Sequence, residues 1–332
     1  MADKTKKVDP GDFVPDYDAE KYSFPVPEMP PVDNKMDPAS HKGNWLWVHY
    51  DSTNHSHRNE DSLKAMPPPL TDVVTPENPL EIDVFYSMRS PYSYLSLQRY
   101  TWLNSYYNCD VNIKVIFPVA VRTPGMFAGG GQSEHPTKKA AKKGGRWYKW
   151  ADAVHDTARM GQYEGVPFRF ADPDPIVQNH WPFENANSGF ILPLEQQPYI
   201  TWLVRLGNAA QLEGKTLEYV NAVSPLIWGG ESDFWPAEIE GAVNSIGMDY
   251  EATIKDIQAN PQKYDDVWQK NQTEFLASGH GGVPCGVFRG EPFFGQDRFD
   301  LIFWRLRQSG LTERPTPRPP IVTKPLRWPD NI

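Results

Sequence analysis

The chain runs through Leu80-Glu-Ile-Asp-Val-Phe-Tyr86, Met88-Arg-Ser-Pro-Tyr-Ser-Tyr94 and Val111-Asn-Ile-Lys-Val-Ile-Phe117. Apolar and polar residues alternate in the first and third stretches, as they do in β-strands that bury one face. From Pro91 to about Asn104 the residues favour a helix, because apolar side chains recur at helical spacing. A strand, a helix and a strand in this order predict two parallel strands joined by a right-handed crossover.

Beyond these residues the chain divides into a helical part and a second part with strands. Between Val119 and Gly281 strand signals largely vanish, and helices are expected near 138–162, 197–212, 214–224, 236–247 and 261–278. Two short strands follow, at Pro284–Phe288 and Glu291–Phe294, and a closing helix runs from Asp297 to about Gln308. This is the order of an interrupted thioredoxin fold. We therefore predict an α/β, thioredoxin-like fold at 80–118 and 282–311, interrupted by a helical insertion domain at 119–281.

Both ends of the chain are rich in proline. Twelve of the 33 prolines lie in the first 80 residues, and others follow Arg314 at Pro315, Pro317, Pro319, Pro320, Pro325 and Pro329. Because such composition disfavours regular elements, we interpret 1–79 as an N-terminal arm and 312–332 as a C-terminal tail. Trp45, Trp47 and Trp328 would otherwise expose large apolar rings, so we predict a homodimer in which an arm packs on the neighbouring subunit.

Composition and charge narrow the class of partner. The formal net charge is −9 and the pI is near 5.4, whereas nucleic-acid binding depends on Lys and Arg that release counterions. We expect no nucleic-acid partner. A polar start and the lack of a run of roughly 20 apolar residues lead us to expect no membrane partner and a cytoplasmic location. The two cysteines, Cys109 and Cys285, form no Cys-x-x-Cys pair, so thiol chemistry would need a thiol from outside the chain.

Ser90 is the first candidate site residue, because it lies where the first strand meets the helix. Serine before proline is a common helix start in which the hydroxyl is the N-cap. The same position would let the hydroxyl hydrogen-bond a thiolate, an anion that the helix dipole also favours. The residues alone leave both interpretations open.

Two further motifs precede the last helix. In Gly281-Gly-Val-Pro284, one interpretation is that the Val283-Pro284 bond is trans and the proline simply opens a strand. The alternative is a cis bond, which would turn the backbone N–H and C=O of Val283 outward to pair with an extended peptide. In Phe293-Phe-Gly-Gln-Asp-Arg-Phe-Asp300, Gln296 or Asp297 caps the helix. Alternatively, Asp297 holds an amino group while helix N–H groups hold a carboxylate.

In this order and spacing, the motifs resemble those of one family. Ser-Pro-Tyr-Ser-Tyr-Leu, Gly-Val-Pro and Glu-Pro-Phe-Phe-Gly-Gln-Asp-Arg are similar to the DsbA-like family that contains 2-hydroxychromene-2-carboxylate isomerases and kappa-class glutathione transferases. The resemblance covers roughly residues 80–311. Further similar motifs lie in the insertion: Tyr148-x-x-x-Asp152, Gly165-Val-Pro-Phe-Arg-Phe170 and Trp228-Gly-Gly.

The resemblance implies glutathione as a cofactor and a set of residues that hold it. Ser90 matches the serine that hydrogen-bonds the glutathione sulfur. Val283 and Pro284 match a backbone clamp on its cysteine, for which we predict a cis bond facing the helix start at Pro91. Gln296 and Asp297 match the site of the γ-glutamyl group.

Other positions depart from the family pattern or face the substrate in it. The lysine that usually precedes Tyr148 by three residues is Gly145 here, so Lys143 or Arg146 is the candidate replacement as a cofactor-binding residue. The candidate substrate contacts are Arg89, Tyr92 and Trp228. Arg89 and Cys285 differ from the usual family residues and are expected to mark a changed substrate pocket.

The implied function is glutathione-dependent isomerisation of a small aromatic or conjugated electrophile, through reversible addition of the thiolate. A kappa-class-like glutathione transferase would use the same residues and release the conjugate. A non-catalytic thioredoxin-like protein would instead hold a peptide in the cleft, and a disulfide oxidoreductase is disfavoured because serines occupy the place of a redox pair. No metal is expected, since the residues His49, Asp51, His55 and His57 lack a supporting ligand pattern.

Overall fold

In the computed structural model, the described residues are 73–118, 121, 147–177, 197–230 and 232–320, and residues 147–154 are described by their backbone alone. The strands are β1 (Leu80–Tyr86), β2 (Cys109–Val115), β3 (Cys285–Phe288) and β4 (Glu291–Phe294). The α-helices are α3 (Pro91–Tyr106), α7 (Trp147–Glu164), α8 (Pro198–Leu212), α9 (Thr216–Trp228), α10 (Ile239–Ser245), α11 (Tyr250–Ala259), α12 (Pro261–Ala277) and α13 (Phe299–Gln308). Two 3-10 helices, η4 (Trp235–Glu238) and η5 (Gln296–Arg298), precede α10 and α13.

The strands form one mixed sheet in the order β2-β1-β3-β4. β1 and β2 are parallel, with Leu80 opposite Cys109 and Tyr86 opposite Val115, which confirms the predicted parallel pair. β3 runs antiparallel to β1, and β4 runs antiparallel to β3. The two halves of the sheet therefore meet at β1 and β3, although the insertion separates them in sequence. This is the predicted thioredoxin-like fold, with a mixed sheet and several helices.

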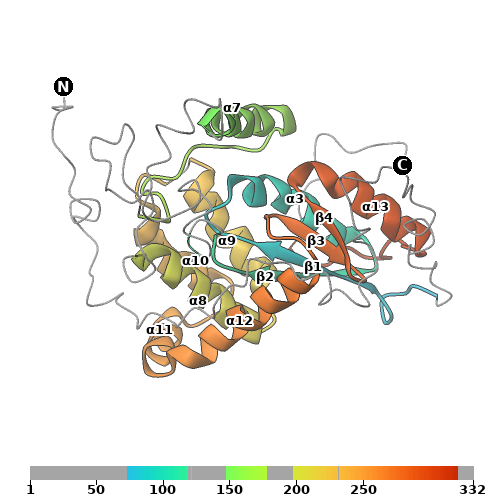
Figure 1. Cartoon of the computed structure of the whole chain (residues 1–332). Coiled ribbons are helices and arrows are strands. Elements are labelled where there is room, and N and C mark those ends of the chain that lie inside the picture. The colour runs from blue at the N-terminus through green and yellow to red at the C-terminus, as the bar shows by residue number, and fades with distance from the viewer. Residues whose placement is uncertain (1–72, 119–120, 122–146, 178–196, 231, 321–332) are drawn as a thin grey trace.

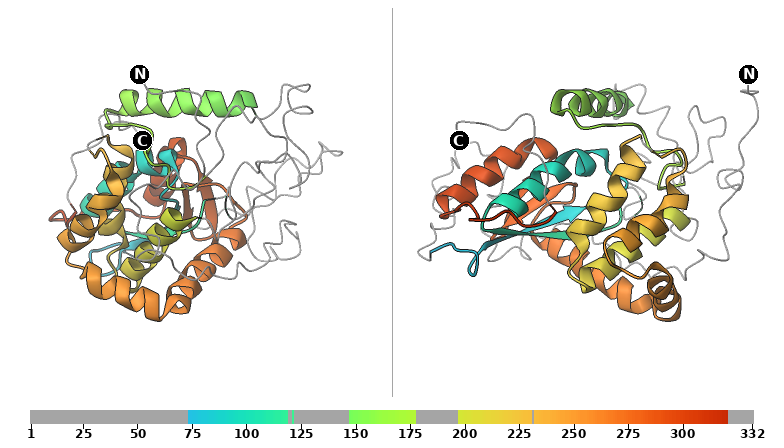
Figure 2. Two further views of the ribbon diagram at one scale, coloured as in Figure 1. Left: turned by 90° about the vertical axis from the view of Figure 1, so that its left-hand side faces the viewer. Right: turned by 180° about the vertical axis from the view of Figure 1, so that it is seen from behind.

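Helices cover both faces of the sheet (Figures 1 and 2). On one face lie α3 and α13, where the rings of Tyr100 and Phe299 meet edge to face at 5.2 Å. On the other face lies α12, where Phe275 stacks on Phe85 of β1 at 4.6 Å. Burying such a side chain contributes roughly 1.5–3 kcal/mol relative to leaving it in water. The sheet is thus the middle layer of the fold.

The helix α3 starts where the sequence predicts and ends two residues later than expected. Ser90 is its N-cap and Pro91 its first residue, a position where proline's missing N–H is not needed. Most of the helix is buried, because α9, α7 and the sheet all contact it. Such enclosure explains why apolar residues lie around the whole circumference of α3.

The insertion is helical, as predicted, but its boundaries differ from the expected ones. Helices α8, α9, α10 and α12 match four expected stretches, and α7 begins at Trp147, since 138–146 lies outside the described residues. The sequence interpretation missed α11 altogether. Its start is nevertheless ordinary, because the Asp249 carboxylate accepts the Ala252 N–H at 2.9 Å as an N-cap.

A buried ion pair joins α8 to α12. The Arg205 guanidinium donates to both carboxylate oxygens of Asp265 at 2.9 and 2.8 Å, and the two side chains are 0% and 3% exposed. Burial raises the pKa of Asp265, while the bond from Arg205 lowers it. Because removing one partner would leave the other charge buried alone, this pair fixes how the two helices are placed along one another.

The described part of the C-terminal tail packs on the same chain. Residues 312–320 contain no helix and run beside the end of α3, where the Arg314 N–H donates to Tyr106 O at 2.7 Å. The side chains of Arg314 and Arg318 both donate to Asp110. Residues 321–332 and 1–72, and with them Trp45, Trp47 and Trp328, lie outside the described residues. None of the helices described is long and apolar enough to cross a membrane.

Candidate functional site

Three loops meet at one end of the sheet. In the strand register, Phe85 lies opposite Cys285, and Cys285 lies opposite Phe294. The end of β1, the start of β3 and the end of β4 are therefore neighbours. The Gly295 N–H also donates to Pro284 O at 2.8 Å, which joins the last two loops. Because α3 follows β1 directly, this arrangement brings the predicted residues Ser90, Val283 and Gln296 to the same end of the sheet.

Ser90 occupies the turn between β1 and α3 and is partly buried. Its backbone is extended, its N–H donates to Ser87 O at 3.0 Å, and its hydroxyl oxygen accepts the Ser93 N–H at 3.2 Å. Within the described part of the chain, the hydroxyl proton has no acceptor. The oxygen therefore caps the helix and still has a proton to donate to a ligand.

The bond between Val283 and Pro284 is cis, which confirms that prediction. Cys285 lies opposite Phe85, so Pro284, the residue before it, lies beside the end of β1. This is the same end of the sheet as the start of α3. Val283 is partly buried, and neither its N–H nor its C=O is hydrogen-bonded to any residue that the structure describes. Both groups are therefore available to pair with an extended ligand.

Gln296 and Asp297 lie in η5, directly after β4, and differ in exposure. Gln296 is 6% exposed, and both its backbone oxygen and its Oε1 accept from Arg99 Nη1, at 2.5 and 3.1 Å. The Asp297 carboxylate is 58% exposed and pairs with Arg298 at 2.7 Å. Asp297 is thus open to a ligand cation, whereas the Nε2 atom of the Gln296 side chain has no hydrogen bond to a described residue.

Arg89 and Tyr92 flank Ser90 and both contact the insertion. The Arg89 guanidinium donates to the two carboxylate oxygens of Asp174 at 3.2 and 2.9 Å, and the side chains are 18% and 26% exposed. The Tyr92 hydroxyl donates to Asp156 of α7 at 2.8 Å. Because Asp174 neutralises Arg89, the guanidinium borders the site as half of an ion pair and not as a free cation.

Trp228 does not suit the predicted role of a substrate contact. Its side chain is buried, its indole N–H donates to Met88 O at 2.9 Å, and Phe168 stacks parallel to its ring at 6.1 Å. Little ring surface is left for a ligand. Trp228 instead supports the turn that carries Ser90, because its hydrogen bond ends two residues before that serine.

Cys285 does not mark the substrate pocket that its departure from the family pattern suggested. The side chain is fully buried in a small cluster with Phe85, Ile116 and Phe275. Burial raises the pKa of its thiol to about 12, and burial likewise raises the pKa of Cys109. Since the thiolate is the reactive form, neither cysteine is suited to be a nucleophile.

Two residues near these loops were missed by the sequence interpretation. Arg99 lies further along α3 than Ser93, and it forms an ion pair with Glu164 of α7 as well as its bonds to Gln296. Desolvation lowers the pKa of Arg99, and the carboxylates of Asp300 and Asp297 oppose this. The sequence does contain a sign of this role. Arg99 is a charged residue in a helix whose apolar residues lie on all sides, and a charge in such a buried helix needs a specific partner.

His280 is the other missed residue, four positions before the strand-opening proline. Its Nδ1 accepts the Gly282 N–H at 3.0 Å and its ring stacks on Phe294 at 4.3 Å. Burial lowers the pKa of His280. Gly282 has no room for a side chain, since a Cβ there would lie 2.4 Å from Phe294 Cε2. The imidazole and Phe294 therefore hold the loop that carries Val283.

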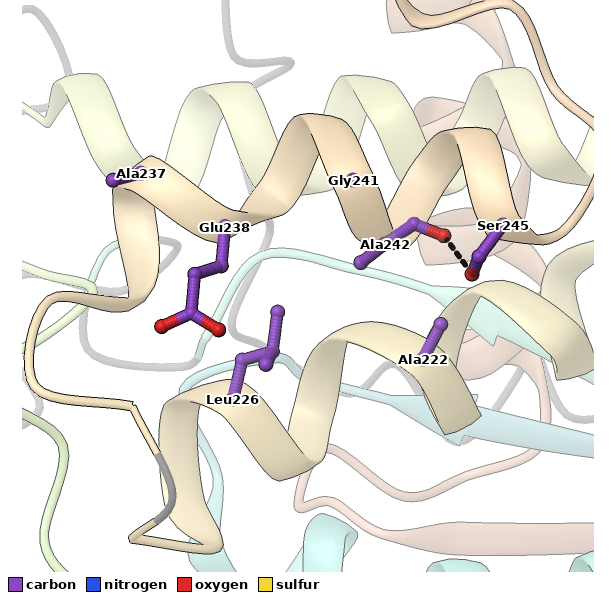
Figure 3. A pocket seen from close by; sticks show the side chains of 7 residues that line it. All are labelled: Ala222, Leu226, Ala237, Glu238, Gly241, Ala242 and Ser245. Carbon is purple, nitrogen blue, oxygen red and sulfur yellow. Dashed lines mark hydrogen bonds between the residues drawn. The ribbon is translucent and has the colours of Figure 1, made fainter.

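Lys143, Arg146 and Gly145 lie outside the described residues, as do His49, Asp51, His55 and His57. In the ranges that the structure describes, no three His, Cys, Asp or Glu side chains gather in a way that could hold a metal ion. A shallow cavity of about 440 Å³ lies between α9 and α10, lined by small side chains such as Ala222 and Gly241 (Figure 3). It contains none of the predicted site residues.

Comparison with known proteins extends these observations. The family model described as DSBA-like thioredoxin domain matches residues 81–306, which span both halves of the sheet and the insertion. A solved structure of a 2-hydroxychromene-2-carboxylate isomerase has 18% sequence identity and a TM-score of 0.49, over 69% of this chain and 95% of that chain. A probable DsbA oxidoreductase from Streptomyces coelicolor has 17% identity and a TM-score of 0.47, over 69% of this chain and 89% of its own. No curated protein matches.

Proposed function

We propose that this chain, which belongs to the DSBA-like thioredoxin domain family, is a glutathione-dependent isomerase that acts on an aromatic or conjugated electrophilic substrate, as 2-hydroxychromene-2-carboxylate isomerases do. Both of its own thiols are buried and have raised pKa values. The N-cap and the first turn of α3 hold Ser90 and Ser93 in place of a cysteine pair. Thiol chemistry at this turn therefore needs a thiol that is bound from solution.

The observation that carries the proposal is the hydrogen bonding of Ser90. Its hydroxyl oxygen already accepts the Ser93 N–H, and its proton has no acceptor among the described residues. A hydroxyl so arranged can donate to an anion placed at the N-terminus of α3, where the helix dipole also favours negative charge. The second serine, Ser93, is fully buried, and its oxygen accepts the Ser87 N–H. Ser90 is thus the suitable donor of the two.

The neighbouring loops fit the remaining parts of glutathione. Val283 would pair its free N–H and C=O with the cysteinyl backbone, in the manner of an added strand. The exposed carboxylate of Asp297 would hold the γ-glutamyl ammonium by a charge-assisted hydrogen bond. The candidate partners of the glycyl carboxylate, Lys143 and Arg146, belong to residues that the structure does not describe.

Bound glutathione would supply a thiolate that can add to an electrophilic carbon and leave it again. The task of Ser90 is to donate its proton to the charged sulfur and not to the neutral thiol, which lowers the thiol pKa from about 8.5 toward neutrality. Tyr92 and the Arg89–Asp174 ion pair border this turn, and their side chains are partly exposed. Because that pair carries no net charge, it offers the substrate no unmatched charge.

Titration of the bound thiol in Ser90 variants tests the proposal. In Ser90→Ala, loss of a hydrogen bond to a charged group costs roughly 1.5–3 kcal/mol, or about one to two pKa units. The thiolate absorbance of bound glutathione should therefore appear at higher pH than in the wild type. Ser90→Gly is the matched control, because glycine restores much of a helix cap without a hydroxyl. If all variants share the wild-type thiol pKa and differ only in melting temperature, Ser90 is a cap alone and the mechanism is wrong.

Product analysis tests the reaction class. An isomerase returns glutathione unchanged, so the glutathione concentration should stay constant while the substrate is converted to an isomer of equal mass. Steady consumption of glutathione, with release of a stable conjugate, would contradict isomerisation and identify a transferase that uses the same residues.

A further inference from the structure

Arg99 is a buried charged residue that the proposed reaction does not use directly. Its side chain is 9% exposed and lies within α3, and its partners come from two other elements. One is Glu164 at the end of α7, with a side chain 4% exposed. The other is Gln296 in η5, which offers both its backbone oxygen and its side-chain oxygen. Arg99 therefore connects the insertion to the loop that follows β4.

The bonds from Arg99 determine which way the Gln296 amide points. A guanidinium has only donors, so the atom of the amide that faces it must be the oxygen. The Oε1 atom accepts from Nη1 at 3.1 Å. The Nε2 atom then points away, makes no hydrogen bond to a described residue, and is not sealed from solvent. The Gln296 side chain therefore keeps an N–H donor that no described residue uses.

Glu164 limits what Arg99 itself can bind. Since its carboxylate pairs with the guanidinium in a buried position, the positive charge of Arg99 is matched inside the protein. A ligand anion beside η5 would thus meet the neutral amide of Gln296 first. Next to it, the exposed carboxylate of Asp297 suits a cation. The loop offers a donor for a carboxylate and an acceptor for an ammonium on adjacent residues.

We infer that Arg99 is a positioning residue, which fixes the Gln296 amide so that its Nε2 donates to the α-carboxylate of the γ-glutamyl group while Asp297 accepts from its ammonium. This inference rests on the proposed function. It predicts selectivity for a zwitterionic amino-acid end on the thiol ligand. The same loop without Arg99 could flip the amide and present its oxygen, which a carboxylate would repel.

Calorimetric titration of the full-length protein with two thiols tests this inference. Glutathione carries the γ-glutamyl group, and cysteinylglycine lacks it. We expect the wild type to bind glutathione more tightly. In Gln296→Glu, two oxygens still face Arg99 but the N–H donor is lost, so glutathione affinity should fall about tenfold to a hundredfold. The affinity for cysteinylglycine should stay within about twofold, because it makes no contact there. Arg99→Gln should lose the same discrimination.

A matched variant separates positioning from stability. Arg305→Gln removes a comparable arginine, 7% exposed and paired with Glu291, that does not contact Gln296. It should lower the melting temperature and keep the wild-type ratio of the two affinities. If Arg99→Gln does not fold, Gln296→Glu decides the question alone. Discrimination that survives in Gln296→Glu would overturn the inference and leave the proposed function intact, whereas a wild type that binds no glutathione would overturn the proposed function itself.

Discussion

Ser90 is a helix cap, and the same hydroxyl is the one to which we assign a chemical role. The sequence left two interpretations of this serine open, a helix cap and a thiolate donor. The two roles would use different parts of the hydroxyl, since the oxygen accepts the Ser93 N–H and the proton has no acceptor among the described residues. A cap and a donor are therefore compatible, and a loss of stability on mutation would not by itself argue against a role in chemistry.

His280 gives a prediction at the same scale. Burial lowers its pKa in the folded protein, whereas the unfolded value is about 6.5. Below that pH the unfolded chain binds more protons than the folded one, so the free energy of unfolding should decrease as the pH falls. The bond that Nδ1 accepts from Gly282 has the same consequence, because a protonated Nδ1 cannot accept it. Urea unfolding at several pH values between about 7.5 and 5 measures the effect.

Two variants decide whether His280 is responsible. His280→Gln keeps a polar side chain without a titrating group, so its stability should depend less on pH than that of the wild type. His155 of α7 is exposed, and His155→Gln should keep the wild-type dependence. Equal pH dependence in the wild type and in His280→Gln would show that other groups cause it.

Among the elements, β3 joins the two halves of the sheet, because it pairs with β1 from before the insertion and with β4 from after it. It lies between β1 and β4 in the sheet, and side chains of α3 and α13 approach it closely. A Cβ at Gly286 would lie 2.4 Å from Ile302 Cδ1 of α13 and 2.9 Å from the Tyr100 hydroxyl of α3. Glycine at this position thus allows α3 and α13 to cover the strand.

Gly286→Ala should therefore destabilise the protein. Ile302 is buried and has little space to move into, and overpacking of this kind costs about 1–3 kcal/mol. Gly241→Ala in α10 is the control, because a Cβ there meets nothing within 4 Å. Alanine in that helix should be neutral or stabilise by up to about 1 kcal/mol. Urea unfolding curves measure both, and an unchanged midpoint for Gly286→Ala would contradict the close approach.

The predictability of each element follows from how local its signals are. β1 was predictable from its alternating apolar and polar residues, and α3 from the Ser-Pro pair at its start. β4 was predictable from its short apolar run, so each of these signals lies in or directly beside the element itself. α11 was missed because it is short and mixes apolar with polar residues, so that the Asp249 cap was its main local signal. The partners of Arg99 and the burial of Trp228 could not be predicted, because they depend on contacts with residues more than 60 positions away.

At the scale of the whole molecule, the homodimer remains a prediction. It depends on arms whose tryptophans, Trp45, Trp47 and Trp328, lie beyond the residues that the structure describes. Light scattering of the full-length protein should give the mass of a dimer, and a variant without residues 1–72 should give a smaller assembly if the N-terminal arm holds the subunits together. A monomer that deletion of either arm leaves unchanged would refute the prediction.

For the molecule as a whole, we propose that a DSBA-like thioredoxin fold whose own thiols are buried binds an external thiol and ionises it. Binding and ionisation are linked, because a thiol with a pKa near 8.5 is mostly protonated at neutral pH in solution. If it is bound as a thiolate, its proton must be released.

Calorimetric titration of the full-length protein with reduced glutathione, in neutral buffers of different ionisation enthalpy, measures this release directly. We predict saturable binding with release of between about half a proton and one proton for each glutathione bound, because a thiol whose pKa is near neutrality is about half ionised at pH 7. The Ser90→Ala variant should release clearly fewer protons, because its bound thiol would stay protonated. Absence of binding by the wild type, or binding without proton release, would contradict the account.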